Sequence, residues 1–262
     1  MFLLLLSVSS LLTDGCRSGN NEDITPVDST ALSSCILLSE KINGILLRAY
    51  EYDSTRKLTR MWEYAGSNLS NSLVKRYQFD YNSKNTLIRL HETNIAVQDR
   101  SYIYELDYTG NRLTTIRPFR VFNSGLRADD TLNVGYDLNE RIAEVKSRNG
   151  IRSKWEYDTG GNVTKWLIRT PLMKSDSLIA EYGSFDEKVS IYAFSKGIQL
   201  VNLLSGRAHS LRNPLRYTAS GQSVEAIYQY NDERVPTLAV LKFKSNDNTL
   251  RETVYSYELS CK

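Results

Sequence analysis

A short phrase of alternating aromatic and polar residues recurs through most of the chain. From Tyr104 to Leu113 it reads YELDYTGNRL. Aspartates of successive copies stand at positions 53, 80, 107, 137, 158 and 186, between 21 and 30 residues apart. A period of that length is typical of one repeated supersecondary unit. Further copies begin at Tyr50, Tyr77, Val134, Trp155 and Tyr228, with a fainter one at Tyr182.

Each copy predicts a β-hairpin. Tyr50 and Tyr52 are two residues apart and therefore share one face of an extended strand, while Glu51 and Asp53 take the other. The aspartate can hydrogen-bond its own downstream backbone, and the glycine or asparagine that follows tolerates positive φ, so the chain reverses there. Hairpins joined end to end predict an all-β, antiparallel meander that forms a curved sheet or a half-open barrel.

The return strands leave one question open. Their apolar residues fall six and nine positions after the second aromatic, an odd separation that puts them on opposite faces unless a bulge intervenes. Either both faces of the sheet are partly covered, or bulges recur and bend it. The pairs are Leu58 and Met61, Ile142 and Val145, and Val163 and Trp166.

Helical signal is scarce. At most one short helix is expected, over residues 196–205 (KGIQLVNLLS), and that run would also serve as a strand. It lies within 175–216, a region that breaks the hairpin rhythm and is expected to cap the sheet or pack across it.

Composition narrows the class of protein. A chain of 262 residues with 41% hydrophobic content can bury a core, and 17 tyrosines against 7 phenylalanines suit half-buried sheet surfaces. The formal net charge of +3 arises from nearly balanced charges, so the basic surface of a nucleic-acid binder is not expected.

The first residues predict export. Residues 1–15 contain an apolar run too short to span a bilayer and read as a signal peptide. The run ends in LTDGC, which resembles a bacterial lipobox with Cys16 as the lipidated residue; the alternative is an ordinary secretory signal. Residues 16–33 are polar and read as a flexible tether, and 34–262 as a single repeat domain. These features predict an outer-membrane lipoprotein, periplasmic or surface-exposed.

Two cysteines remain after Cys16. Cys35 and Cys261 lie at the beginning and end of the predicted domain, and in an oxidising compartment they could form a disulfide. Such a bridge predicts that the first and last strands are neighbours; the alternative is two free thiols.

Residues for catalysis or metal binding are few. Neither of the two histidines, His91 and His209, lies in a nucleophile or metal motif. Single aspartates at turns are explained by turn capping more simply than by calcium binding. We therefore predict no catalytic residue, no metal and no cofactor, and lean against an enzyme.

The aromatic residues offer one candidate binding chemistry. Trp62, Trp155 and Trp166 could stack on a carbohydrate, although Trp155 and Trp166 coincide with core positions of the neighbouring repeats, which favours packing in the core.

The repeated phrase resembles the YD repeats of large bacterial shell proteins and, more closely, a group of uncharacterised Bacteroidetes lipoproteins with degenerate YD-like hairpins. In those lipoproteins a later Tyr-Asp-Lys block with Asn-Pro-Phe resembles Ser184 to Lys188, where Val189 and Ser190 replace Asn-Pro. A closing strand of the form Y-x-Y-N-x-x-x-x-P-T matches Tyr228 to Thr237. The likeness covers residues 35–261 and implies an envelope lipoprotein, without an activity to carry over.

These observations lead to one hypothesis and two alternatives. The hypothesis is a lipid-anchored envelope protein whose β-repeat surface binds or scaffolds a glycan or another envelope protein. The first alternative is a hydrolase of an extracellular polymer, with carboxylates from 175–216 completing its site. The second is a purely structural envelope component.

Overall fold

The computed structural model describes residues 35–262 except 66–71, 96, 98–99 and 207–209. The predicted signal peptide, Cys16 and the tether lie outside the described residues. The described part of the chain is all-β apart from one 3-10 turn, η2 (Ile191–Phe194), and one helix, α2 (Lys196–Leu204). Its strands are β1 (Cys35–Ile42), β2 (Ile45–Tyr52), β3 (Leu58–Tyr64), β4 (Leu73–Tyr81), β5 (Leu87–Asn94), β6 (Ser101–Thr109), β7 (Arg112–Phe122), β8 (Gly125–Ala128), β9 (Leu132–Tyr136), β10 (Ile142–Ser147), β11 (Arg152–Tyr157), β12 (Val163–Arg169), β13 (Ser177–Val189), β14 (Arg212–Ala219), β15 (Gln222–Tyr230), β16 (Pro236–Lys244) and β17 (Leu250–Cys261).

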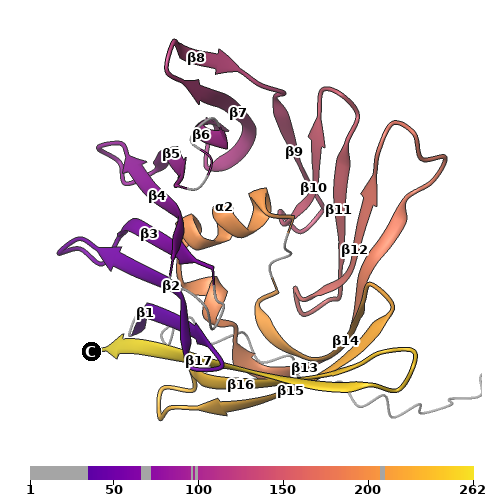
Figure 1. The fold of residues 1–262 in the computed structure, drawn as a ribbon. Helices are drawn as coiled ribbons and strands as arrows, with labels where there is room; N and C mark the ends of the chain where they lie inside the picture. The colour runs from indigo at the N-terminus through magenta and orange to yellow at the C-terminus, as the bar shows by residue number, and fades with distance from the viewer. Residues whose placement is uncertain (1–34, 66–71, 96, 98–99, 207–209) are drawn as a thin grey trace, which may run out of the picture.

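The strands close into a barrel (Figure 1). Successive strands pair antiparallel, which confirms the predicted meander. The first strand, β1, pairs with both β2 and the last strand, β17, and the ring is completed where Thr115 and Ile116 of β7 meet Asn133 and Leu132 of β9. The described residues thus form a 16-strand barrel, with β8 as a hairpin extension of β7. The sheet closes further than the expected half-open form.

A disulfide joins the first strand, β1, to the last strand, β17. Cys35 and Cys261 are bonded across a sequence separation of 226, at the first residue pair of the β1–β17 ladder.

A recurring bulge answers the question left by the return strands. Tyr52 pairs with Leu58 but Tyr50 pairs with Met61, so the return strand holds one extra residue. The shift turns both Leu58 and Met61 toward the interior, where they are 1% and 0% exposed. The return strand holds one extra residue in five other hairpins as well, next to the residue pairs Tyr81–Leu87, Tyr108–Leu113, Tyr136–Ile142, Tyr157–Val163 and Tyr230–Pro236.

Threonine occupies the extra position in four of these hairpins and ties it down. Its hydroxyl donates a hydrogen bond to a carbonyl oxygen of the facing strand, a contact that the sequence pattern did not reveal. The bonds run from Thr59 to Glu51 (3.1 Å), Thr114 to Asp107 (3.1 Å), Thr164 to Glu156 (3.2 Å) and Thr237 to Gln229 (3.3 Å).

Most hairpin turns are built as predicted. Asp53 Oδ1 accepts hydrogen bonds from the N–H groups of Thr55 and Lys57, at 2.8 and 3.0 Å, and Arg56 adopts φ +64°. Asp137 and Asp158 cap their turns in the same way, and Asn82 and Asn231 do so with an amide oxygen.

Three of the six repeat aspartates do not lie at hairpin turns as predicted, and one of these, Asp186, lies within β13. Asp80 and Asp107 lie on strands, where Asp80 contacts His91 Nε2 at 2.8 Å and Asp107 accepts from Arg117 at 2.8 Å. The reason is that these strands carry one further aromatic before the turn, Tyr81 and Tyr108, so the reversal comes two residues later.

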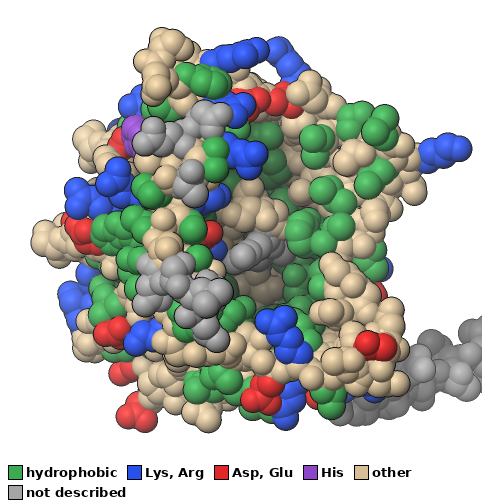
Figure 2. All heavy atoms as spheres, in the orientation of Figure 1, with side chains coloured by type: hydrophobic (Ala, Val, Ile, Leu, Met, Phe, Trp, Pro, Cys, Tyr) green, Lys and Arg blue, Asp and Glu red, His purple; other side chains and the backbone are tan. Residues whose placement is uncertain are grey.

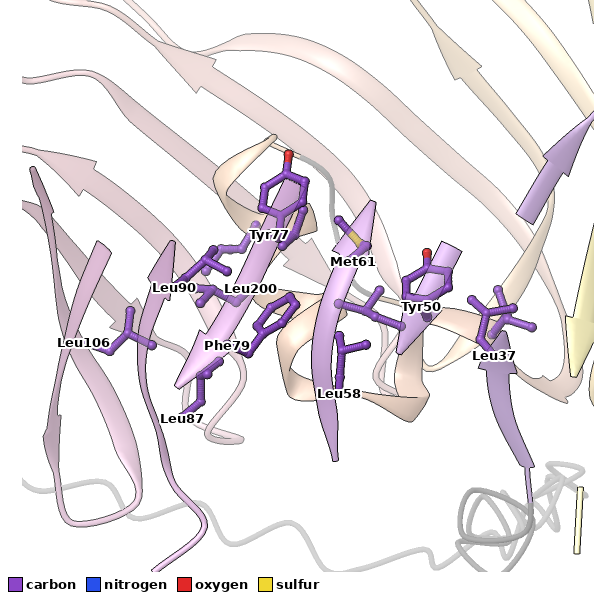
Figure 3. Close-up of a cluster of buried hydrophobic side chains, with 14 of the residues drawn as sticks. Leu37, Tyr50, Leu58, Met61, Tyr77, Phe79, Leu87, Leu90, Leu106 and Leu200 are labelled. Atoms are coloured by element: carbon purple, nitrogen blue, oxygen red, sulfur yellow. The ribbon is translucent and has the colours of Figure 1, made fainter. Parts of the chain in front are cut away.

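The core lies inside the ring and includes the helix. Side chains from successive strands point inward against α2 (Figure 3). Gly197 permits this close approach, because a Cβ atom there would lie 2.9 Å from Phe79 and 3.0 Å from Leu58. We call η2 and α2 together the plug; it confirms the short helix expected in 196–205 and packs across the interior of the barrel (Figure 1).

The Asp186 carboxylate accepts several hydrogen bonds beside the point where the chain leaves the wall to form the plug. The chain leaves the wall after Val189 and returns at Arg212, its partner in the β13–β14 ladder. Nearby, Asp186 accepts hydrogen bonds from the side chains of Asn213 and Tyr230, and Asn213 also donates to the Val189 carbonyl. Residues 184–188 and the segment Tyr228 to Thr237, which are distant in sequence, are therefore in contact through Asp186 and Tyr230.

The outer wall of the barrel is charged. Its side chains form ion pairs between neighbouring strands, and the side chains of these pairs are between 26% and 73% exposed. The pairs include Arg60–Glu51 (3.5 Å), Arg89–Glu105 (2.9 Å), Arg117–Asp107 (2.8 Å), Arg152–Glu144 (3.3 Å), Lys165–Glu181 (3.8 Å) and Arg216–Glu225 (3.3 Å). Among the described residues, no helix has the length and apolar character needed to cross a bilayer.

Candidate functional site

A polar cavity of about 340 Å³ lies between the barrel wall and the last turn of α2. Figure 2 shows the barrel hollowed at the end that faces the viewer, between the β2–β6 side and the β10–β14 side. The wall contributes Lys75, Tyr77, Glu92 and Tyr104, and the helical segment contributes Val201, Leu204 and Ser205.

The wall side of this cavity is organised around one carboxylate. Glu92 Oε1 lies 2.8 Å from Lys75 Nζ, and Tyr104 donates its hydroxyl to Glu92 Oε2 at 3.1 Å. The Glu92 side chain is 10% exposed, whereas that of Lys75 is 32% exposed, so the cavity opens to solvent on the Lys75 side. Burial raises the pKa of Tyr104 well above its usual value, and the nearby Glu92 carboxylate raises it further. The tyrosine therefore stays a neutral hydrogen-bond donor.

A second polar cluster connects the plug to the first two strands. Glu40 is 1% exposed and accepts hydrogen bonds from the hydroxyls of Tyr50 and Tyr192. Arg48, also buried, lies 3.9 Å from Glu40 and 3.3 Å from Glu63. Burial raises the pKa of Tyr50, and repulsion by Glu40 adds to the effect. The two tyrosine hydroxyls and the two carboxylates are directed at one another or at Arg48, whose Nε is buried without a hydrogen-bond partner among the described residues. The cluster joins the plug to the first strands and indicates a structural anchor.

Three other hollows lie elsewhere on the described residues. One, of about 180 Å³, lies on the other side of the plug and is lined by Ile142, Tyr157, Tyr192 and Gln199 among others. A second, of about 370 Å³, lies over β2 to β4, where the charged lining residues Glu51 and Arg60 are about half exposed. The third, of about 750 Å³, is an open groove over β13 to β17 on the outer wall, with exposed charges of both signs such as Arg216 and Glu225. None of the three places a buried charge in a cavity.

The predicted stacking tryptophans do not meet in any cavity described above. Trp155 is 2% exposed and pairs with Trp166 across the β11–β12 ladder, both on the core side. Each indole Nε1 is buried without a hydrogen-bond partner among the described residues. Trp62 is half-buried beside the buried Met61, opposite the exposed Arg76 on β4.

Neither the described histidine nor any metal-binding cluster of the described residues contributes to the cavity. His91 contacts Asp80, and His209 lies outside the described residues. No cluster of three or more His, Cys, Asp and Glu side chains suited to a metal occurs in the described part of the chain.

Sequence reasoning missed Lys75, Glu92 and Tyr104. The signal that could have found Glu92 is its position two residues after the fully buried Leu90, on the same face of β5. A carboxylate at an inward position of a barrel is costly unless it is paired, and so it is a candidate for function.

Comparison with known proteins shows similarity in fold. No protein-family model and no curated protein matches the chain. A solved porin-like protein from Bacteroides uniformis is similar over 86% of this chain and 97% of its own, with a TM-score of 0.53 and 11% identity. This likeness extends to the barrel fold and not beyond it.

Two further solved structures resemble the chain more weakly. A porin-like protein from Bacteroides vulgatus matches 85% of this chain and 98% of its own, at 11% identity and a TM-score of 0.36. The TcdB2-TccC3-TEV structure matches 79% of this chain and 10% of its own, at 10% identity and a TM-score of 0.34. Scores this low do not support a shared fold.

Proposed function

We propose that the chain is a lipid-anchored protein of the bacterial cell envelope that serves as a binding module. Cys16 carries the lipid, residues 16–33 form the tether, and the barrel is held in water beside the outer membrane, on its periplasmic or its outer side. The observation that carries this proposal is the charged outer wall of the barrel.

The outer wall disfavours insertion of the barrel into lipid. A lipid-facing arginine or lysine at the bilayer midplane costs about 2–4 kcal/mol, and lipid-facing strands carry an apolar band instead. Here Arg60, Arg117 and Arg216 face outward in ion pairs, each about half exposed or more. The porin-like neighbour from Bacteroides uniformis supports an envelope location, and the charged wall supports attachment through the N-terminal cysteine.

The interior favours binding over a purely structural role. Burying an ion pair brings a desolvation penalty, and apolar residues of similar size would stabilise a barrel at least as well. Lys75 and Glu92 nevertheless line a cavity that solvent reaches. Groups of this kind are typical of a site that meets a polar partner.

Labelling with palmitate in a Gram-negative host tests the anchor. The full chain should incorporate the label and sediment with membranes, whereas Cys16→Ser should lose the label and be released as soluble protein. Ser18→Ala is the matched control, because it changes a neighbouring residue of the tether, leaves the Cys35–Cys261 disulfide intact and should keep the label. Retention of label by Cys16→Ser would refute the anchor.

A further inference from the structure

We propose that the cavity between Lys75, Glu92 and the end of α2 binds a small, neutral, polyhydroxylated ligand, the size of one or two sugar rings. This inference rests on the proposed binding role and specifies its ligand. It assigns the ligand to the barrel interior and not to the outer repeat surface.

The charge balance of the site selects against ions. Lys75 and Glu92 lie 2.8 Å apart, so the cavity wall carries one positive and one negative charge that neutralise each other. An anion would be attracted by Lys75 and repelled by Glu92, and a cation would meet the reverse. A neutral ligand leaves the pair intact and adds hydrogen bonds to it.

The site retains hydrogen-bonding capacity for hydroxyl groups. A carboxylate offers about four acceptor positions and an ammonium group three N–H donors. Lys75 and Tyr104 occupy two of the acceptor positions on Glu92, and Glu92 occupies one of the donors on Lys75. Adjacent sugar hydroxyls can donate to Glu92 and accept from Lys75, and bonds to charged groups are the stronger kind.

The remaining walls suit the apolar face of a ring. Val201 and Leu204 present aliphatic carbons from the helix. On the wall, the Tyr104 ring stacks against Tyr102 with centroids 5.7 Å apart, which fixes its orientation. The cavity volume of about 340 Å³ lies at the lower end of the range for small-molecule sites, about 300–1,000 Å³. A long polymer would not fit without extending out of the barrel.

Calorimetric titration of the full chain in detergent tests the proposal. The probes are glucose, galactose, mannose and N-acetylglucosamine, with cellobiose, lactose and chitobiose as their disaccharides. At least one should bind, and Glu92→Gln and Lys75→Met should each weaken that binding at least tenfold. Glu51→Gln on the outer wall is the matched control and should leave the affinity unchanged. Galacturonate and glycine test the charged alternatives, an anion and a zwitterion.

The outcomes separate clearly. Leu204→Trp fills the cavity from the helix side and should abolish binding while the thermal unfolding midpoint stays within a few degrees of the parent. Three results would each overturn the inference. They are no binding of any neutral sugar, tighter binding of galacturonate or glycine than of the neutral sugars, and unchanged affinity in both Glu92→Gln and Leu204→Trp. Palmitate labelling of the same preparation reports the anchor independently, so a failed ligand and a failed location are distinguishable.

Discussion

The hydroxyl of Tyr192 lies 3.3 Å from Oε2 of Glu40 and joins the 3-10 turn of the plug to the first strand across 152 residues of sequence. The other oxygen of the same carboxylate accepts from Tyr50. A buried charge thus fixes where the plug enters the barrel, and the position of α2, which forms one wall of the cavity beside Lys75 and Glu92, depends on it.

We expect Glu40→Gln to lower the free energy of unfolding by about 3–5 kcal/mol, because it leaves the buried Arg48 without its nearest buried counter-charge. Urea denaturation followed by tryptophan fluorescence measures the loss. Glu63→Gln is the matched control, since Glu63 also pairs with Arg48 but is 25% exposed, and its loss should be clearly smaller. Equal losses for the two variants would mean that burial of Glu40 is not what makes it important.

The fold was largely predictable because its determinants are local. Two-residue alternation around Tyr50 and Tyr52 specifies a strand, and Asp53 caps the turn that follows, whatever the rest of the chain does. Closure of the barrel was not predictable to the same degree. It depends on the short contact of Thr115 and Ile116 with β9, which belongs to no repeated pattern.

The only sequence signal for the site is the spacing of Leu90 and Glu92, and it is hidden because a bulge changes which side chains face inward. Counting by twos from the buried Leu87 puts Leu90 and Glu92 on the outer wall. The extra residue in β5 reverses that assignment, and both point into the barrel. The partners Lys75 and Tyr104 then come from other strands, which only the strand order brings together.

The disulfide should contribute strongly to stability. Its closed loop is very long, and the chain-entropy model assigns such a bridge about 5 kcal/mol. We expect the double variant Cys35→Ser with Cys261→Ser to unfold at markedly lower guanidinium concentration, and reducing agent to shift the parent by a similar amount while leaving the double variant unchanged. A parent whose unfolding does not respond to reductant would contradict the expectation.

The bulge threonines should each stabilise their hairpin modestly. Replacing Thr164 with valine keeps the branched shape but removes the hydroxyl that donates to the Glu156 carbonyl, so about 1 kcal/mol should be lost. Thr59→Val should lose less, because its bond is exposed to water. In another hairpin Ile88 occupies the extra position. There Ile88→Thr would add the missing hydroxyl, so this variant should be as stable as the parent or more stable. Chemical denaturation of the three variants tests the order.

Acid should weaken the hairpin turns. Hydrogen bonds from the Thr55 hydroxyl and the Lys57 N–H lower the pKa of Asp53, and bonds from Ser245 and Thr249 lower that of Asp247 to about 2. A carboxyl group whose pKa is lower in the folded than in the unfolded chain stabilises the fold fully above the unfolded value, about 3.9. That contribution is lost as the pH falls through the folded value. We therefore expect the thermal midpoint to fall between about pH 4 and pH 2.

Exchange of the capping residues isolates this effect. Asn82 and Asn231 cap equivalent turns with an amide oxygen that does not titrate, so Asp53→Asn should fold normally and lose less stability between pH 4 and pH 2 than the parent. The reciprocal Asn82→Asp installs a titrating cap in an equivalent turn and should make the acid loss steeper. Thermal melting at half-unit steps from pH 2 to pH 6 compares the three chains. Parallel curves would show that the capping carboxylates do not control acid stability, since both exchanges keep the capping oxygen and change the charge of the cap, which at Asp53 also faces Lys57 Nζ at 3.5 Å.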